Sequence, residues 1–104
     1  MKNIVYLLSI FLFITISVLN AQSCDITIGP DVFYIDGESM NIPAGSTVCI
    51  EGSEKDYLLL RNIHGTENNP IIIKNVGSEV IFNTDHYFGI KIANCSFIKF
   101  LGNG

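Results

Sequence analysis

Three short segments carry the pattern that decides the fold: LLLRN at residues 58–62, IIIKN at 71–75 and IKIAN at 90–94. Each reads apolar, any residue, apolar, any residue, asparagine. Alternate residues of a β-strand point to the same side, so the two apolar side chains and the asparagine of each segment share one face. We therefore expect the three segments to lie side by side in the same direction, with their apolar faces pooled. Their basic residues then face water: Arg61, Lys74 and Lys91.

The asparagine that ends each segment allows two interpretations. An amide at the inner end of a strand is costly to bury unless it is paired. In stacked coils the amide above can donate to the amide below while the asparagine backbone turns the chain, which predicts a ladder of Asn62, Asn75 and Asn94. Alternatively, each asparagine only ends its strand, because asparagine favours turns.

The chain after residue 21 favours short strands throughout. It has no convincing 3.6-residue periodicity and no capping box before an apolar run, whereas runs rich in Ile, Val, Phe and Tyr are separated by glycines. Copies of the pattern begin 13 and then 19 residues apart, which suits coils of two or three strands but breaks strict periodicity. The unequal spacing could instead mark successive faces of one coil. Eight strands are expected: Ile26–Ile28, Val32–Ile35, Thr47–Glu51, Tyr57–Arg61, Ile71–Lys74, Val80–Asn83, Gly89–Ala93 and Phe97–Leu101.

The N-terminus predicts export. Lys2 precedes an apolar run of 16 residues from Ile4 to Leu19, and Ala21 supplies a small residue for cleavage. The run is shorter than the roughly 20 residues that a membrane-spanning helix needs. We therefore expect a signal peptide over residues 1–21, a secreted or cell-surface location, and no integral membrane span after cleavage. Lipidation of Cys24 is a lesser alternative, because residues 21–23 fit that processing poorly.

Charge and cysteine content limit the kinds of partner that the chain could bind. Cleavage would remove Lys2, the only charged residue of the signal segment, and take the formal charge from −4 to −5. Nucleic acid is therefore not expected as a partner, since it needs clustered Lys and Arg. In an oxidising compartment Cys24 and Cys49 form the plausible disulfide, and Cys95 is left either for an outside partner or as a buried thiol. The sequence contains no Cys/His cluster that would predict a metal site.

Several stretches of the chain resemble a known superfamily. The segments IPAGSTVCI at residues 42–50 and GTENNPIII at 65–73 are similar to early coils of secreted right-handed parallel β-helix proteins of the pectate-lyase-like superfamily. Residues 80–83 and 89–102 look like further rungs. The resemblance covers residues 42–104, and it leaves residues 22–41 as a lead-in or N-terminal cap.

This resemblance implies an all-β fold made of the first coils of a right-handed parallel β-helix. It also implies that the intact protein acts on or binds extracellular polysaccharide. If the protein is an enzyme, it would be a polysaccharide lyase or glycoside hydrolase with its catalytic coils outside this sequence. The same scaffold suits a non-catalytic cell-surface or adhesion protein, so that alternative stays open.

The sequence stops directly after an expected strand, Phe97–Leu101, which leads us to expect a truncated fragment without activity of its own. The competing fold is a small antiparallel β-sandwich of about seven strands. Its hairpin signals are nearly absent, since only Asp36-Gly37 matches one.

The residues that could carry chemistry yield no catalytic, cofactor or metal assignment. Asp85 and His86 adjoin Tyr87 and Phe88, an arrangement that could hold a sugar but is interpreted as a polar loop with rings over the coil's edge; His64 is interpreted as a turn residue. Paired carboxylates can cleave glycosides only at a defined separation, which a sequence does not supply. The acidic residues are therefore expected to be mostly solvated turn residues: Asp25, Asp31, Asp36, Glu38, Glu51, Glu54, Asp56, Glu67, Glu79 and Asp85.

Overall fold

The computed structural model describes residues 23–102, which contain seven β-strands and no helix. The expected signal peptide at residues 1–21 lies outside these described residues. Within them, no helix is long and apolar enough to cross a membrane. The strands are β1 (Ile26–Ile28), β2 (Tyr34–Asp36), β3 (Thr47–Lys55), β4 (Leu58–Arg61), β5 (Ile71–Phe82), β6 (Ile90–Ala93) and β7 (Ile98–Leu101).

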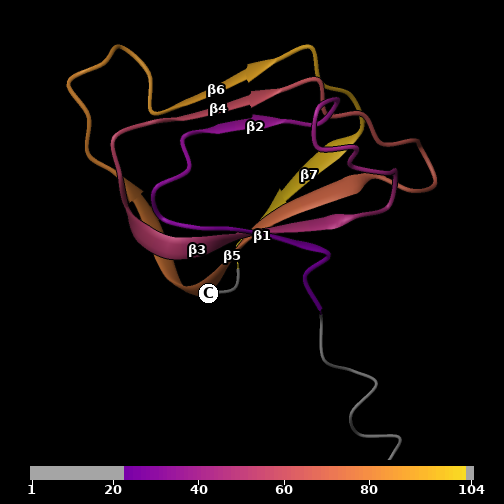
Figure 1. The fold of residues 1–104 in the computed structure, drawn as a ribbon, viewed down its shortest axis with the longest axis horizontal. Helices are drawn as coiled ribbons and strands as arrows, with labels where there is room; N and C mark the ends of the chain where they lie inside the picture. The colour runs from indigo at the N-terminus through magenta and orange to yellow at the C-terminus, as the bar shows by residue number, and fades with distance from the viewer. Residues whose placement is uncertain (1–22, 103–104) are drawn as a thin grey trace, which may run out of the picture.

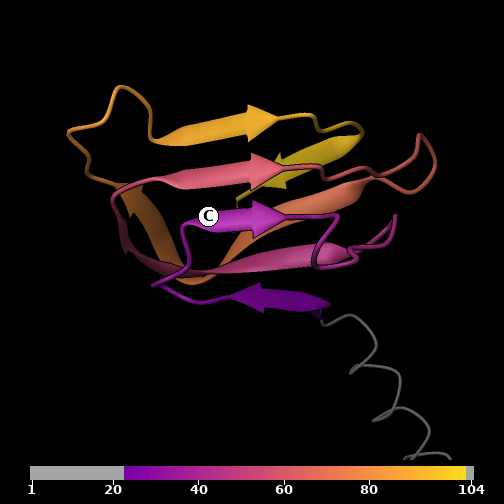
Figure 2. The ribbon, with the colours of Figure 1, turned by 45° about the horizontal axis from the view of Figure 1, so that its top comes forward.

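The strands form two parallel sheets that the chain visits alternately. One sheet has the order β1-β3-β5-β7 and the other the order β2-β4-β6 (Figure 1). Each circuit of the chain, called a coil below, adds one strand to each sheet. Three coils and the first strand of a fourth are therefore present in residues 23–102. Figure 2 shows the coils stacked as layers, with β2, β4 and β6 pointing one way and β1 the other.

This arrangement confirms the expectation of an all-β chain with parallel strands. Every pairing between the strands of residues 23–102 is parallel. The alternative of an antiparallel sandwich is therefore wrong. The boundary expected between residues 41 and 42 stays a prediction, although β1 and β2, which precede it, pair with β3 and β4.

The core lies between the two sheets. In β4 the burial alternates, with Leu58 and Leu60 fully buried and Arg61 exposed, as a strand with one inner face requires. Both strand families supply the core side chains, so neither sheet could bury its apolar face without the other. The core residues are Ile28, Ile35, Ile42, Val48, Ile50, Leu58, Leu60, Ile63, Ile71 and Ile73.

Two of the three pattern segments lie side by side, and the third does not. Leu58 pairs with Ile90 in parallel register, so β4 and β6 are neighbours. Ile71 lies in β5, which belongs to the opposite sheet and pairs with β3 and β7. The prediction that all three segments are neighbours is therefore wrong. Only half a circuit separates residue 58 from residue 71, which places their strands on different faces of the coil.

The asparagine ladder forms with a different membership. Asn94 Nδ2 donates to Asn62 Oδ1 at 2.6 Å, and Asn62 Nδ2 donates to Asp36 Oδ1 at 3.3 Å. Asn75 is not part of it, because it lies within β5 and its amide donates to the carbonyl oxygen of Ser78 at 3.0 Å. Asn62 and Asn94 have φ angles of 55° and 52°, so each also makes the turn that follows its strand. The aspartate and two asparagines follow one corner of the coil through three layers.

One long strand replaces two of the expected ones. Residues 71–74 and 80–83 were expected as separate strands, whereas β5 runs unbroken from Ile71 to Phe82. The register between the two strands shifts where Gly52 of β3 lies opposite residues 77–79 of β5, so the extra residues of this bulge belong to β5. A bulge bends the strand that carries it, so β5 can serve two sides of the coil.

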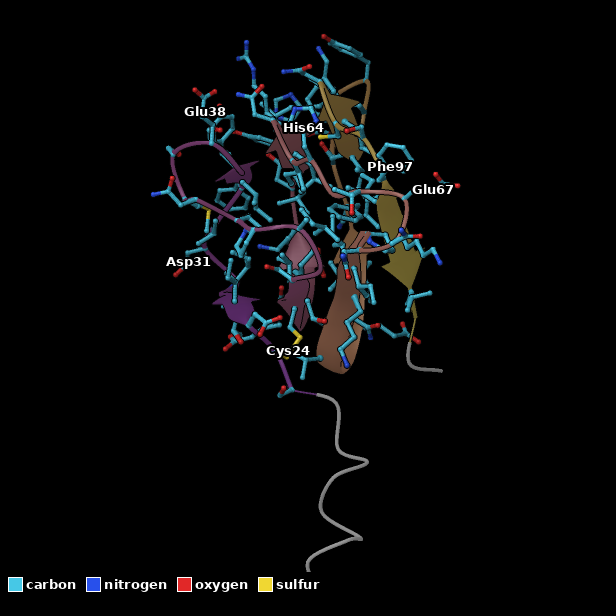
Figure 3. All side chains as sticks on the ribbon, turned by 90° about the vertical axis from the view of Figure 1, so that its right-hand side faces the viewer. Cys24, Asp31, Glu38, His64, Glu67 and Phe97 are labelled. Carbon is cyan, nitrogen blue, oxygen red and sulfur yellow. A yellow bond between two sulfur atoms is a disulfide. The ribbon has the colours of Figure 1, made fainter. Side chains whose placement is uncertain are left out.

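The first coil is anchored at its start. Cys24 and Cys49 form a disulfide with a Cα–Cα distance of 5.7 Å, which ties the segment before β1 to β3 (Figure 3). The bond uses the Cys24 thiol, which a lipid anchor would also need. Asp25 adds a second link, since its Oδ2 accepts the backbone N–H of Thr47 at 2.7 Å.

Candidate functional site

A column of aromatic rings lines the corner where the chain enters the β2-β4-β6 sheet. Phe33 and Tyr57 directly precede β2 and β4, and Phe88 lies two residues before β6. The Phe33 and Tyr57 ring centroids are 5.5 Å apart, and those of Tyr57 and Phe88 are 6.0 Å apart. These separations are typical of attractive tilted and edge-to-face ring pairs. The repeat of the coil thus places one ring above another.

His86 joins this column by contacting Tyr57, a residue of the neighbouring coil. Its ring meets Tyr57 edge to face at a centroid distance of 5.2 Å, and its Nε2 lies 3.3 Å from Asp56 Oδ2. Both side chains of the pair are about half exposed. The sequence places Asp85 next to His86, but the carboxylate in contact is that of Asp56. The Thr84 hydroxyl also accepts the backbone N–H of His86 at 2.9 Å, which helps to shape the loop.

The outer surface of the column carries an exposed ring and a cation. Tyr87 is 91% exposed and its ring contacts that of Phe88 at a centroid distance of 5.2 Å. Lys91 Nζ lies 5.7 Å from the Phe88 ring centroid, within cation–π range. We call Phe33, Tyr57, His86, Tyr87 and Phe88 the ring cluster. It combines the apolar faces of several tilted rings with hydrogen-bonding groups at its margin.

A buried lysine supports the base of the ring cluster. Lys55 is 1% exposed, and its Nζ donates to the carbonyl oxygens of Gly29, Pro30 and Val32 at 3.2, 2.8 and 2.7 Å. Its Nζ also lies 5.2 Å from the Phe33 ring centroid. Burial lowers the pKa of Lys55, and the nearby charge of Asp31 partly offsets this. Lysine is rarely buried, and nothing in its local sequence marks Lys55 as an exception.

A second polar group lies at the opposite corner of the coil. His64 Nδ1 is 2.8 Å from Ser96 Oγ, and the two residues form an isolated parallel bridge between coils. In Figure 3 Asp31, His64 and Phe97 mark successive coils along the stack. His64 adjoins a shallow hollow of about 250 Å³. The hollow runs over the ladder and is lined by Gly37, Glu38, Ile42, Asn62, His64 and Asn94.

A second hollow, larger than the one beside His64, is lined by few groups that could carry chemistry. It measures about 520 Å³, lies near the start of the first coil and includes Asp25, Met40 and Ser46 in its lining. Asp25 is its only charged side chain and already accepts the N–H of Thr47. The Ser46 hydroxyl donates to the carbonyl oxygen of Pro43 at 2.7 Å. We therefore place the candidate site at the ring cluster rather than at this larger hollow.

Several carboxylates expected in turns have structural partners. Glu54 accepts the amide of Asn83 at 2.9 Å, and Asp56 contacts His86. Burial acts to raise the pKa of Asp36, but hydrogen bonds from the Glu38 backbone and the Asn62 amide outweigh it, so the pKa lies below its usual value. Asp36 is therefore ionised at neutral pH. Among residues 23–102, no group of three or more His, Cys, Asp or Glu side chains could hold a metal ion.

Cys95 is a free thiol in the third coil. It is half-buried and packs against the core, and its Sγ lies 3.4 Å from the carbonyl oxygen of Ala93. This placement leaves both earlier interpretations of Cys95 open.

Comparison of the chain with family models, with curated proteins and with solved structures finds no match.

Proposed function

We propose that this chain is the N-terminal scaffold of an exported right-handed parallel β-helix protein and that its ring cluster binds extracellular polysaccharide. Two parallel sheets visited alternately by the chain support the fold. The charged start and apolar run of residues 2–19 support export. The ring cluster supports the choice of polysaccharide as the ligand.

The ring cluster suits the two kinds of surface that a sugar ring presents. A pyranose ring has an apolar C–H face and hydroxyls around its edge, so it suits a site with a flat apolar surface and a few polar groups at the margin. Tyr87 offers an exposed ring, which the Phe88 ring contacts edge to face. The margin holds His86 and Lys91, which can donate hydrogen bonds to hydroxyls, and Asp56, which can accept them.

Stacking rather than charge should dominate this binding. The formal charge after cleavage of the signal peptide is −5, and Asp56 lies at the margin of the ring cluster. A strongly anionic polymer would therefore meet repulsion as well as Lys91. We propose neutral or weakly acidic polysaccharide as the preferred class, with an affinity that depends little on salt.

Binding of the chain to a panel of neutral and acidic polysaccharides, measured by affinity electrophoresis and calorimetry, tests this function. We expect Tyr87→Ala to weaken binding about fivefold, because a lost stacking contact is worth about 1 kcal/mol. The matched control is Tyr34→Ala, which removes another partly exposed tyrosine ring, on β2. Equal losses in both variants would contradict a site at the ring cluster.

Failure to bind any polysaccharide would favour the alternative of a non-catalytic cell-surface scaffold. The proposal gives no residue of this chain a catalytic role, so incubation with the panel should release no unsaturated or reducing ends. Cleavage by the purified chain would contradict that part of the proposal.

A further inference from the structure

The connection between β5 and β6 carries three members of the ring cluster: His86, Tyr87 and Phe88. Figure 2 shows this connection as a loop that projects beyond the stack. We call residues 84–88 the ring loop. Within it the Thr84 hydroxyl accepts the backbone N–H of His86, and Tyr87 is almost fully exposed. The position of Tyr87 therefore depends on the side chains that tie the ring loop to the neighbouring coil.

His86 and Phe88 tie the ring loop to the segment that precedes β4. Their rings meet the Tyr57 ring at centroid distances of 5.2 and 6.0 Å. His86 adds a polar contact, since its Nε2 lies 3.3 Å from Asp56 Oδ2. A histidine side chain ordinarily changes charge between pH 5 and 8, so the polar contact is the one that responds to pH.

The charge of the imidazole decides how strongly it holds the carboxylate of Asp56. A protonated imidazole donates from both ring nitrogens and attracts an anion. A neutral imidazole carries no charge and can donate from Nε2 in only one of its two tautomers. Carboxylates ordinarily stay ionised down to about pH 4. The contact is therefore strongest between about pH 4 and 6, and it weakens as the pH rises toward 8.

The other charged groups of the ring cluster do not explain such a response. The charged and titratable groups around His86 are Asp56 and Tyr57 of the neighbouring coil, Asp85 and Tyr87 of the ring loop, and two cations that contact other rings, Lys91 over Phe88 and Lys55 over Phe33. Aspartate, tyrosine and exposed lysine ordinarily keep one charge state between pH 5 and 8. Burial lowers the pKa of Lys55, but its Nζ contacts the first coil, so substitution of His86 would leave any response of Lys55 in place.

We propose that His86 and Asp56 form a pH-dependent clamp, which orders the ring loop below about pH 6 and so holds Tyr87 in place for its ligand. Both side chains are about half exposed, and exposed ion pairs stabilise only weakly. The clamp should therefore raise the ratio of ordered to open loop by about two- to fivefold. The clamp follows from the contacts alone, whereas its effect on affinity rests on the proposed function.

NMR spectroscopy of the chain without ligand tests the clamp. The Phe88 ring does not titrate, so its cross-peaks to the Tyr57 ring report the ordered loop. We expect these cross-peaks to be stronger at pH 5.5 than at pH 8. Asp56→Asn keeps the shape of the side chain and an acceptor but removes the charge, so it should abolish the difference between the two pH values. His86→Gln should abolish it as well.

His64 supplies the matched control. It is the other histidine of the chain and lies at the opposite corner of the coil, where it contacts Ser96. His64→Gln should therefore keep the pH difference of the Phe88 cross-peaks. Loss of the difference in His64→Gln, or its persistence in Asp56→Asn and His86→Gln, would overturn the proposal.

Binding of a neutral polysaccharide, measured by calorimetry at the same two pH values, gives the second readout. We expect an affinity two- to fivefold higher at pH 5.5, because a ligand that needs the ordered loop binds in proportion to its population. The pH dependence should vanish in Asp56→Asn and remain in His64→Gln. Equal affinities of the native chain at both pH values would overturn the role of the clamp at the site. If no polysaccharide binds, the proposed function fails, while the ring cross-peaks of the free chain still decide whether the clamp exists.

Discussion

At the scale of single residues, Lys55 shows how a charge can stabilise a core without an opposite charge in contact with it. Its ammonium group makes three hydrogen bonds to carbonyl oxygens of one segment, and these satisfy both the lysine and the segment. The segment leads into Phe33, the first ring of the ring cluster. Lys55 therefore links the core of the stack to the candidate site.

We expect Lys55→Met to destabilise the protein by about 3 kcal/mol, because carbonyl oxygens would lose a charged donor while the volume of the side chain is kept. Urea unfolding followed by circular dichroism measures the effect. Lys99→Met is the control, since Lys99 lies exposed on β7 and its replacement should change stability by less than about 0.5 kcal/mol. Similar effects of the two substitutions would contradict a structural role for Lys55.

At the scale of elements, the bulge between β3 and β5 requires glycine. A Cβ on Gly52 would lie 2.5 Å from the backbone carbonyl carbon of Ser78, closer than atoms of adjacent strands can approach. This contact occurs where the register between the two strands shifts. The bulge therefore depends on a residue without a side chain.

Gly52→Ala should accordingly destabilise the chain by about 1–3 kcal/mol, because the backbone of one strand must move. Thermal unfolding measures the loss. Gly29→Ala is the matched control, since a Cβ there meets nothing within 4 Å, and it should have little effect. If Gly29→Ala is as damaging as Gly52→Ala, the cause is general to glycine and not the close approach at the bulge.

At the scale of the whole molecule, stability rests on a narrow core and on one covalent link. Eight of the ten core residues come from strands of the two sheets, and Ile42 and Ile63 come from connecting segments. The last coil leaves part of its apolar surface exposed. The Cys24–Cys49 disulfide spans 25 residues of sequence and fixes the start of the first coil against β3. A crosslink of this span restricts the unfolded chain appreciably.

We expect replacement of both cysteines by alanine to lower the free energy of unfolding by about 3 kcal/mol, most of it through the greater freedom of the unfolded chain. Urea unfolding with and without a reducing agent tests this. Reduction should destabilise the native chain and leave the double variant unchanged. Unchanged stability of the native chain on reduction would contradict the prediction.

The amino-acid sequence alone determined the local structure of this protein. Alternation of apolar and polar residues located most of the strands, because the period of two is a property of the strand itself. The near absence of hairpin signals, of which only Asp36-Gly37 matches one, favoured parallel pairing. The resemblance of residues 65–73 to early coils pointed to the same architecture, which the parallel sheets match at the level of fold class.

Only the tertiary structure decided which segments meet. The number of residues in each corner of the coil determines which of the two sheets the next strand joins. Ile71 therefore pairs with Ile98 rather than with Leu58. The same winding brings Asp36 under Asn62 and His86 against Asp56, contacts between residues at least 26 positions apart. Such contacts depend on the register of whole coils, which no local pattern in the chain encodes.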